Sequence, residues 1–280
     1  MVTPIEGLNT KWDDYNAAKR PGLDSIVYST NRGSQGKDLD VWIATLQWGK
    51  HPKVVSDARP YAPELMSPAD ERGPLEMSNR DFEADPTYSS SALVFSSARD
   101  GGAGGLDLYW GETQAPAVHR LEHLSSSAND AYMTQKFGEV LKPRVLFASD
   151  RGGTGYDIYD AQWESYAIGG APVSVTKVDA LSSSADDNAP YVVAGGDYKT
   201  ADVVFASKRE GGAGGWDIWC SHFDGTTWAT PVAVVIANSE QDEFRPSIAE
   251  WQFLVFSSNR PGGKGGYDLY TVKWTGCPTK

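Results

Sequence analysis

The feature that most constrains this chain is a short segment that occurs five times along its 280 residues. Each copy has an apolar run, then Ser-x-Arg or Thr-x-Arg, a glycine-rich stretch, and an aspartate that opens a second apolar run. The copies read IVYSTNRGSQGKDLDVW, LVFSSARDGGAGGLDLY, VLFASDRGGTGYDIY, VVFASKREGGAGGWDIW and LVFSSNRPGGKGGYDLY. Such internal repetition indicates one structural unit used five times.

Each copy predicts a β-hairpin. In the last copy, residues 254–256 are of the types enriched in buried strands, and residues 267–270 begin the returning strand. The glycines between them permit positive φ and a tight reversal. Successive shared aspartates are 67, 50, 60 and 51 residues apart, which suits four-stranded propeller blades with loops of variable length.

An acidic motif precedes each hairpin and predicts an outer strand, a polar turn and the innermost strand of the next blade. The motif is clearest in residues 236–251, and related stretches are residues 181–192, 124–134 and 77–88. The remaining copy is residues 8–18, where Asn9, Asp13 and Tyr15 align with Asn238, Asp242 and Phe244.

The chain therefore begins with a spare outer strand, and its last hairpin lacks one. We predict that residues 4–9 complete the fifth blade and close the ring, which removes exposed sheet edges. The expected fold is all-β: a single domain over residues 1–280, a five-bladed β-propeller with four antiparallel strands per blade. The longest insertion, residues 56–73, is expected to be a surface loop.

Charge and hydropathy exclude some classes of partner. The net charge of −12 disfavours nucleic acid, because an acidic surface repels phosphate. No run of 18 apolar residues is present, so membrane insertion is not expected, and the first residues lack the basic and apolar regions of a signal peptide. We expect a monomer. The two cysteines, Cys220 and Cys277, are expected to be free thiols, with a disulfide as the alternative.

The hairpin motif resembles the WD40-like repeat of TolB-type bacterial β-propellers. The segment FSSNRPGGKGGYDLY is similar to repeats of periplasmic and outer-membrane-associated proteins of Bacteroidota that carry OmpA-like domains. The resemblance covers nearly the whole chain. It implies a periplasmic or outer-membrane-associated location and contacts with a protein or an envelope glycan. TolB itself has six blades and an additional α/β domain, so its own partners are not implied.

The repeated charges predict a structural role. We expect each repeat arginine to form an ion pair with the aspartate across its own hairpin turn, because a charge-assisted pair would fix the loop. Five equivalent ligand pockets are the alternative. The expected pairs are Arg32–Asp40, Arg99–Asp107, Arg151–Asp157, Arg209–Asp217 and Arg260–Asp268.

Variation among the copies predicts a ligand site instead. One aligned position just after the acidic turn, where the inner strand enters the central channel, differs in every copy. A purely structural position would favour one residue type, so a ligand or partner is expected at this channel mouth. The residues there are Asn16, Asp85, Tyr132, Ala189 and Arg245.

No cofactor is predicted. The acidic turns suggest calcium as a hypothesis, because hard cations take several carboxylates, but the Asp-x-Asp-x-Asp-Gly spacing is missing and capping of the turns explains the acids as well. We therefore assign no metal ligands. The acids concerned are Asp13, Asp14, Glu83, Asp130, Asp186, Asp187, Asp242 and Glu243.

No catalytic constellation stands out. The chain has no Gly-x-Ser-x-Gly elbow, and its four histidines do not form a zinc pattern. We therefore expect a non-catalytic binding or scaffolding module of a bacterial cell-envelope protein, which contacts its partner through the face that carries the glycine-rich and acidic loops. The alternative is a carbohydrate-active propeller that binds or hydrolyses glycans in its central channel, which would need two carboxylates at the site of hydrolysis.

Overall fold

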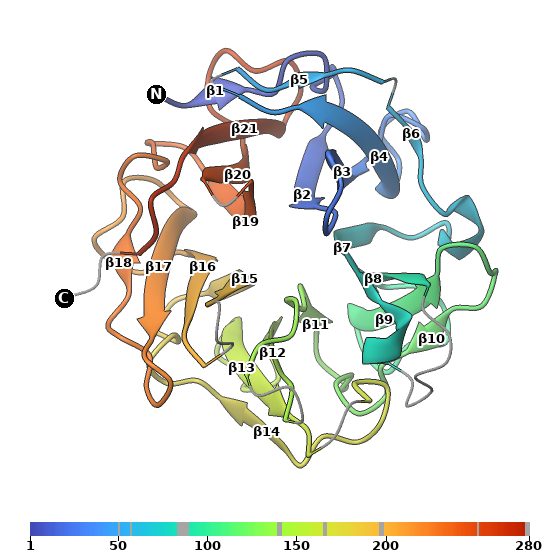
Figure 1. Ribbon diagram of the computed structural model, residues 1–280, viewed down its shortest axis with the longest axis vertical. Coiled ribbons are helices and arrows are strands. Elements are labelled where there is room, and N and C mark those ends of the chain that lie inside the picture. Colours follow the sequence, from blue (N-terminus) through green and yellow to red (C-terminus); the bar gives the residue numbers. More distant parts are fainter. Residues whose placement is uncertain are drawn as a thin grey trace.

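The computed structural model describes residues 1–49, 51–56, 58–82, 90–138, 142–164, 167–195, 199–250 and 252–277. Five antiparallel sheets stand around a central axis as the blades of a propeller (Figure 1). The helices in these ranges are two single 3₁₀ turns, η1 (Pro63–Leu65) and η2 (Asn79–Asp81), and neither has the length or apolar character to cross a membrane. The predicted five-bladed, all-β fold is confirmed.

Every blade runs from an inner strand at the axis to an outer strand at the rim. Blade 1 contains β2 (Asp14–Lys19), β3 (Ser25–Thr30) and β4 (Asp40–Gln47), and its outer edge is shared by β5 (Lys53–Val54) and β6 (Arg59–Pro60). Blade 2 contains β7 (Glu71–Ser78), β8 (Ser91–Ser97), β9 (Asp107–Glu112) and β10 (His119–Arg120). Blade 3 contains β11 (Asp130–Ala131), β12 (Arg144–Ser149), β13 (Asp157–Gln162) and β14 (Ser174–Lys177). Blade 4 contains β15 (Asp187–Ala194), β16 (Ala201–Ser207), β17 (Asp217–Phe223) and β18 (Val232–Ala233).

The fifth blade joins the two ends of the chain. It contains β19 (Glu243–Ala249), β20 (Phe253–Ser258) and β21 (Asp268–Lys273), and its outer strand is β1 (Thr3–Pro4). Thr3 lies opposite Thr271 in this antiparallel pair, which confirms the predicted closure. The strand is shorter than the predicted residues 4–9, because the chain turns at Gly7 with φ of +78°. The Asn9 side chain then bonds the backbone of Leu269. Its Oδ1 accepts from Leu269 N at 2.9 Å, and its Nδ2 donates to the Leu269 carbonyl at 3.0 Å.

One aromatic side chain per blade fills the space between neighbouring sheets. It occupies the same place in the second strand from the axis in every blade and is fully buried. The guanidinium of the repeat arginine lies over its ring, 4.8–5.4 Å from the ring centre. A cation over an aromatic face adds electrostatic attraction to the burial of apolar area. These rings belong to Tyr28, Phe95, Phe147, Phe205 and Phe256.

The acidic motif of the second blade lies earlier than the sequence predicted. Residues 65–71 pass through η1 and the turn into β7, and Glu71 takes the place that Asp130 has in the third blade. The stretch 77–88 is not this motif, because it contains the end of β7 and η2. The insertion expected over residues 56–73 thus contains the missing turn, and Ser67 and Ala69 match Ser126 and Ala128 of the third copy.

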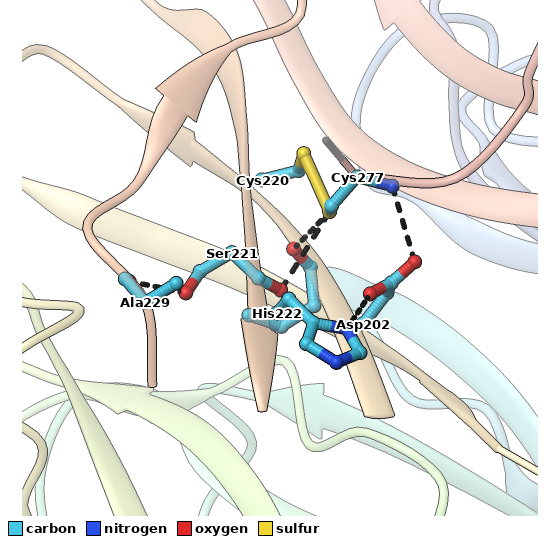
Figure 2. Close-up of a disulfide and its surroundings, with 7 residues drawn as sticks. Asp202, Cys220, Ser221, His222, Ala229 and Cys277 are labelled. Atoms are coloured by element: carbon cyan, nitrogen blue, oxygen red, sulfur yellow. Dashed lines mark hydrogen bonds and ion pairs between the residues drawn. A yellow bond between two sulfur atoms is a disulfide. The ribbon is translucent and has the colours of Figure 1, made fainter. Parts of the chain in front are cut away.

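A disulfide joins Cys220 to Cys277, so the expectation of free thiols is wrong. Figure 2 shows that it connects β17 of blade 4 to the segment after β21. The two Cα atoms are 5.8 Å apart, within the range of protein disulfides. Asp202 supports the same junction, because it accepts a hydrogen bond from the backbone N–H of Cys277 at 3.1 Å and contacts His222 Nδ1 at 2.7 Å.

Loss of this disulfide should destabilise the ring. The bridge closes a loop across 57 positions of sequence, for which chain entropy gives about 4 kcal/mol. We expect the double substitution Cys220→Ser, Cys277→Ser to lower the free energy of unfolding in urea by roughly this amount. The wild-type protein in reductant is the control and should show the same loss. An unchanged unfolding midpoint in both samples would contradict the prediction.

Candidate functional site

The repeat arginines pair with the inner strands of their blades, so the predicted partners across the hairpin turn were wrong. Arg209 Nη2, for example, lies 2.5 Å from Asp187 Oδ1 and also donates to the Leu181 carbonyl at 2.7 Å. We call each such ion pair a latch. The latches replace the predicted pairs Arg32–Asp40, Arg99–Asp107, Arg151–Asp157, Arg209–Asp217 and Arg260–Asp268. The five latches are Arg32–Asp14, Arg99–Glu71, Arg151–Asp130, Arg209–Asp187 and Arg260–Glu243.

Each latch carboxylate also organises the acidic turn before it. The residue four positions earlier is always Ser or Thr, and its hydroxyl bonds to the carboxylate, as Ser183 does to Asp187 at 2.7 Å. All five carboxylates have no solvent exposure. They are therefore fully occupied by structural contacts.

Three of the repeat aspartates bind the hairpin turns instead. Asp217 accepts backbone hydrogen bonds from Ala213 at 2.9 Å and Gly214 at 3.0 Å, and Asp107 and Asp268 act in the same way. A Cβ atom at Gly212 would lie 2.0 Å from this carboxylate, which explains the glycine there. These three aspartates thus cap the hairpin turns of blades 2, 4 and 5, whereas the arginines secure the inner strands.

The calcium hypothesis finds no geometry to support it in the described parts of the chain. No three His, Cys, Asp or Glu side chains come together there as a metal site. The first acid of the turn is also occupied: Asp186 accepts from Tyr156 N at 3.1 Å, and Asp13 and Asp242 make the equivalent bonds at 2.9 Å. Glu83 lies outside the described residues.

Breaking a latch should cost much more than breaking an exposed ion pair beside it. Arg209→Met would leave Asp187 buried without its counter-ion, and we expect a loss of about 3–5 kcal/mol in unfolding free energy. Lys208→Met is the matched control, because the Lys208–Asp186 pair is exposed and should contribute less than about 1 kcal/mol. Urea unfolding of both variants measures the difference, and equal losses would contradict the structural role of the latch.

The varied positions at the axis are brought together but lie below the surface. Asn16, Tyr132 and Arg245 have exposed fractions of 0%, 3% and 0%, and Asp85 lies outside the described residues. All four described positions of the set have positive φ, between 47° and 58°. Gly73, with φ of 60°, takes this place in blade 2, so the alignment with Asp85 was wrong.

Aromatic rings close the channel toward the face of the acidic turns. Tyr15 stacks on Phe244 with ring centroids 5.6 Å apart, and Tyr132 meets Phe244 edge-on at the same distance. Burial raises the pKa of Tyr132, and the nearby charges of Arg72 and Arg245 oppose that shift. A ligand on the loop face would meet this plug and not an open channel.

The described residues form a pocket of about 500 Å³ at the opposite end of the axis. It lies where the inner strands β2, β15 and β19 end and where the β2–β3 turn reverses the chain, so it faces away from the acidic turns. Tyr191, Val193 and Ile248 supply an apolar wall. This volume lies within the range of small-molecule sites.

Charged groups surround the outer part of the pocket. Lys19 pairs with Glu250 at 2.9 Å, and both line it together with Asp24, which is exposed. Arg20 Nη2 donates to Glu76 Oε1 at 3.0 Å and to the Tyr61 hydroxyl at 3.1 Å. The pocket thus combines one aromatic side chain, apolar area and two carboxylates.

Sequence reasoning missed this pocket because its residues occupy different positions in each repeat. Lys19 and Arg20 follow one inner strand, Tyr191 lies within another, and Glu250 follows a third. These strand ends share no residue type, so a comparison of the repeats does not reveal the pocket.

Several solved structures with a similar course of the chain are carbohydrate-acting enzymes. An endo-arabinase from Bacteroides thetaiotaomicron is 14% identical, covers 99% of this chain and 97% of its own, and has a TM-score of 0.58. A GH43 endo-arabinanase from Bacillus licheniformis is 9% identical, with 96% coverage of both chains and a TM-score of 0.59. An α-L-arabinofuranosidase from Podospora anserina is 9% identical, covers 98% of this chain and 96% of its own, and has a TM-score of 0.57. At these identities the likeness shows the fold.

No family model matches the sequence, and no curated protein sequence matches it either. A putative TolB from Agrobacterium tumefaciens is 13% identical, covers 88% of this chain and 69% of its own, and has a TM-score of only 0.47, which carries no argument for the TolB resemblance. The expectation of a non-catalytic scaffolding module is overturned, because the solved structures that match over the whole chain are glycoside hydrolases.

Proposed function

We propose that this chain is a carbohydrate-active propeller that binds a glycan in the axial pocket and hydrolyses a glycosidic bond there. The observation that carries the proposal is the pocket itself, which places Tyr191 beside two carboxylates in about 500 Å³. Ligand pockets combine apolar and aromatic walls with a few orienting polar groups in this way. Full-length similarity to arabinan-acting and arabinofuranoside-acting hydrolases supports the proposal.

The reaction assigns roles to the two carboxylates that line the pocket. Glycoside hydrolysis uses one carboxyl group to protonate the leaving oxygen and a second one to activate water or to attack the sugar. Asp24 and Glu250 are the candidates for these roles. The five latch carboxylates are poor candidates, because each is buried and paired with an arginine.

Hydrolysis is tested on linear arabinan, arabinoxylan and p-nitrophenyl α-L-arabinofuranoside by reducing-sugar and p-nitrophenol release. We expect activity in the wild type and a loss of about 100-fold or more in Asp24→Asn and in Glu250→Gln, since each removes one acid–base group. Asp100→Asn is the matched control, because Asp100 is exposed in the β8–β9 turn of the opposite face. Calorimetry with arabino-oligosaccharides shows binding separately. Binding without turnover would reject hydrolysis, and absence of both would reject the proposed function.

We also propose that the protein is located in an oxidising compartment, the periplasm or the outer-membrane surface. Its partner there is a glycan, which it binds as a monomer. The Cys220–Cys277 disulfide supports this, because disulfides persist outside the reducing cytosol. Fractionation of cells that make the protein, followed by alkylation of free thiols, tests the location. We expect the protein in the envelope fraction with no thiol available. A cytosolic protein with two alkylated cysteines would contradict this.

A further inference from the structure

The described residues also form a pocket in the seam between blades 5 and 1, which the proposed hydrolysis does not use. Its volume is about 450 Å³, again within the range of small-molecule sites. Figure 1 shows β1 and β21 of blade 5 beside β5 of blade 1 at this seam. We call it the seam pocket, and its lining includes Thr3, His51, Gln252, Phe253, Thr271 and Lys273.

One wall of the seam pocket is aromatic. Phe253 is half-buried, and Trp48 of blade 1 stacks on its ring with the centroids 6.1 Å apart. Phe253 lies opposite Lys273 in the sheet, and Thr3 lies opposite Thr271. Because side chains alternate along a strand, Phe253, Thr271 and Thr3 are all on the side of the sheet that faces blade 1. An aromatic ring beside hydroxyl groups matches a sugar, which has an apolar ring face and hydroxyl groups around its edge.

The hydroxyl of Thr271 is unpaired. The residue is 2% exposed, and its Oγ1 has no hydrogen-bond partner among the described residues. Native proteins leave few buried polar groups in this state, because the group has lost its bonds to water and gained none in exchange. Thr271 lines the seam pocket, so a ligand that enters the pocket can supply the missing hydrogen bond.

The groups that line the seam pocket can bind a sugar but cannot cleave one. His51, Gln252 and Lys273 are exposed and offer polar groups at its open side. No Asp or Glu belongs to the described lining, whereas glycoside hydrolysis needs two carboxyl groups. The seam pocket is therefore suited to holding a glycan that is cleaved elsewhere.

The seam pocket and the axial pocket lie at the same end of the ring. Glu250 lines the axial pocket and Gln252 lines the seam pocket, and both belong to the β19–β20 turn. Two residues of chain span at most about 7 Å, so the walls of the two pockets come close together at this turn. One glycan chain of several units can therefore reach from the axial pocket to the seam pocket.

We propose that the seam pocket is a second sugar-binding site, which holds a distal unit of the same glycan that the axial pocket cleaves. This inference rests on the proposed function and adds that its substrate is a chain of several sugar units. The Phe253 ring receives the face of the distal sugar, and the Thr271 hydroxyl forms a hydrogen bond with it. The seam pocket raises the affinity for long chains, because the second contact of a ligand that is already bound is an intramolecular step.

Calorimetry with arabinobiose and arabino-octaose tests the inference, because only the longer ligand can occupy both pockets. We expect the wild type to bind arabino-octaose about tenfold more tightly or better. Thr271→Val keeps the shape of the side chain and should weaken the binding of arabino-octaose about two- to tenfold, the effect of one hydrogen bond. Gln252→Ala should also weaken it. Thr176→Val, on the exposed outer strand of blade 3, is the matched control and should keep the wild-type affinity.

Urea unfolding separates a binding role of Thr271 from a structural one. Because its buried hydroxyl is unpaired, Thr271→Val should not lower the free energy of unfolding. Weaker binding by a variant of unchanged stability then reports a lost contact with the glycan. Gln252→Ala changes an exposed side chain, so the test remains decisive even if Thr271→Val does not fold.

The outcomes distinguish the inference from the function on which it rests. Equal affinities of the wild type for the two oligosaccharides would overturn the second site, and hydrolysis of p-nitrophenyl α-L-arabinofuranoside would show that the axial site still stands. Wild-type affinity for arabino-octaose in both Thr271→Val and Gln252→Ala would overturn the placement of that site in the seam pocket. If neither oligosaccharide binds and no substrate is cleaved, the proposed function fails and the inference fails with it.

Discussion

The buried ion pair between each repeat arginine and the first residue of an inner strand is the interaction on which this propeller depends. In blade 4, Arg209 reaches Asp187 and, with the same nitrogen, the carbonyl of Leu181 at the end of the preceding blade. Asp186 beside it accepts from Tyr156 N in that preceding blade. A short acidic turn is thereby fixed to two blades at once. Because the carboxylate is buried, loss of the arginine leaves an uncompensated charge, which is far more costly than loss of a surface pair.

This arrangement separates the conserved geometry of the ring from its variable chemistry. The arginines, the latch acids and the central aromatic residues repeat in every blade, and they fix where each inner strand begins. The far ends of the inner strands are free to differ, and there the pocket residues Lys19, Tyr191 and Glu250 come together. Function can therefore vary at one end of the axis without disturbing the contacts that hold the ring together at the other end.

The sequence predicted the parts of the fold that repeat. Five hairpins, their glycine turns and the closure of blade 5 by the N-terminal segment follow from patterns that occur several times, so each copy supports the others. The latch partners could not be predicted, because Asp217 follows Arg209 closely in the chain whereas Asp187 stands 22 residues before it, and only the packing of the inner strand selects Asp187. The second acidic turn was misplaced because Glu71 replaces the more frequent aspartate and a proline interrupts the motif. The pocket joins strand ends that share no residue type, so no repeat pattern marks it.

Each blade has one residue with positive φ near the axis, and some of these residues depend on one another for space and contacts. This position has a left-handed backbone, beside a bulge in blades 1, 2, 4 and 5, and such a backbone costs about 1–3 kcal/mol where the residue is not glycine. Gly73 is the copy that avoids this cost, and a Cβ atom there would lie 2.5 Å from Cδ1 of Tyr132. The missing side chain in blade 2 thus makes room for the Tyr132 ring from blade 3, and that ring in turn lies against Arg245 from blade 5. A charge held at the axis by three different blades is a property of the closed ring, and neighbouring residues in the sequence could not position it.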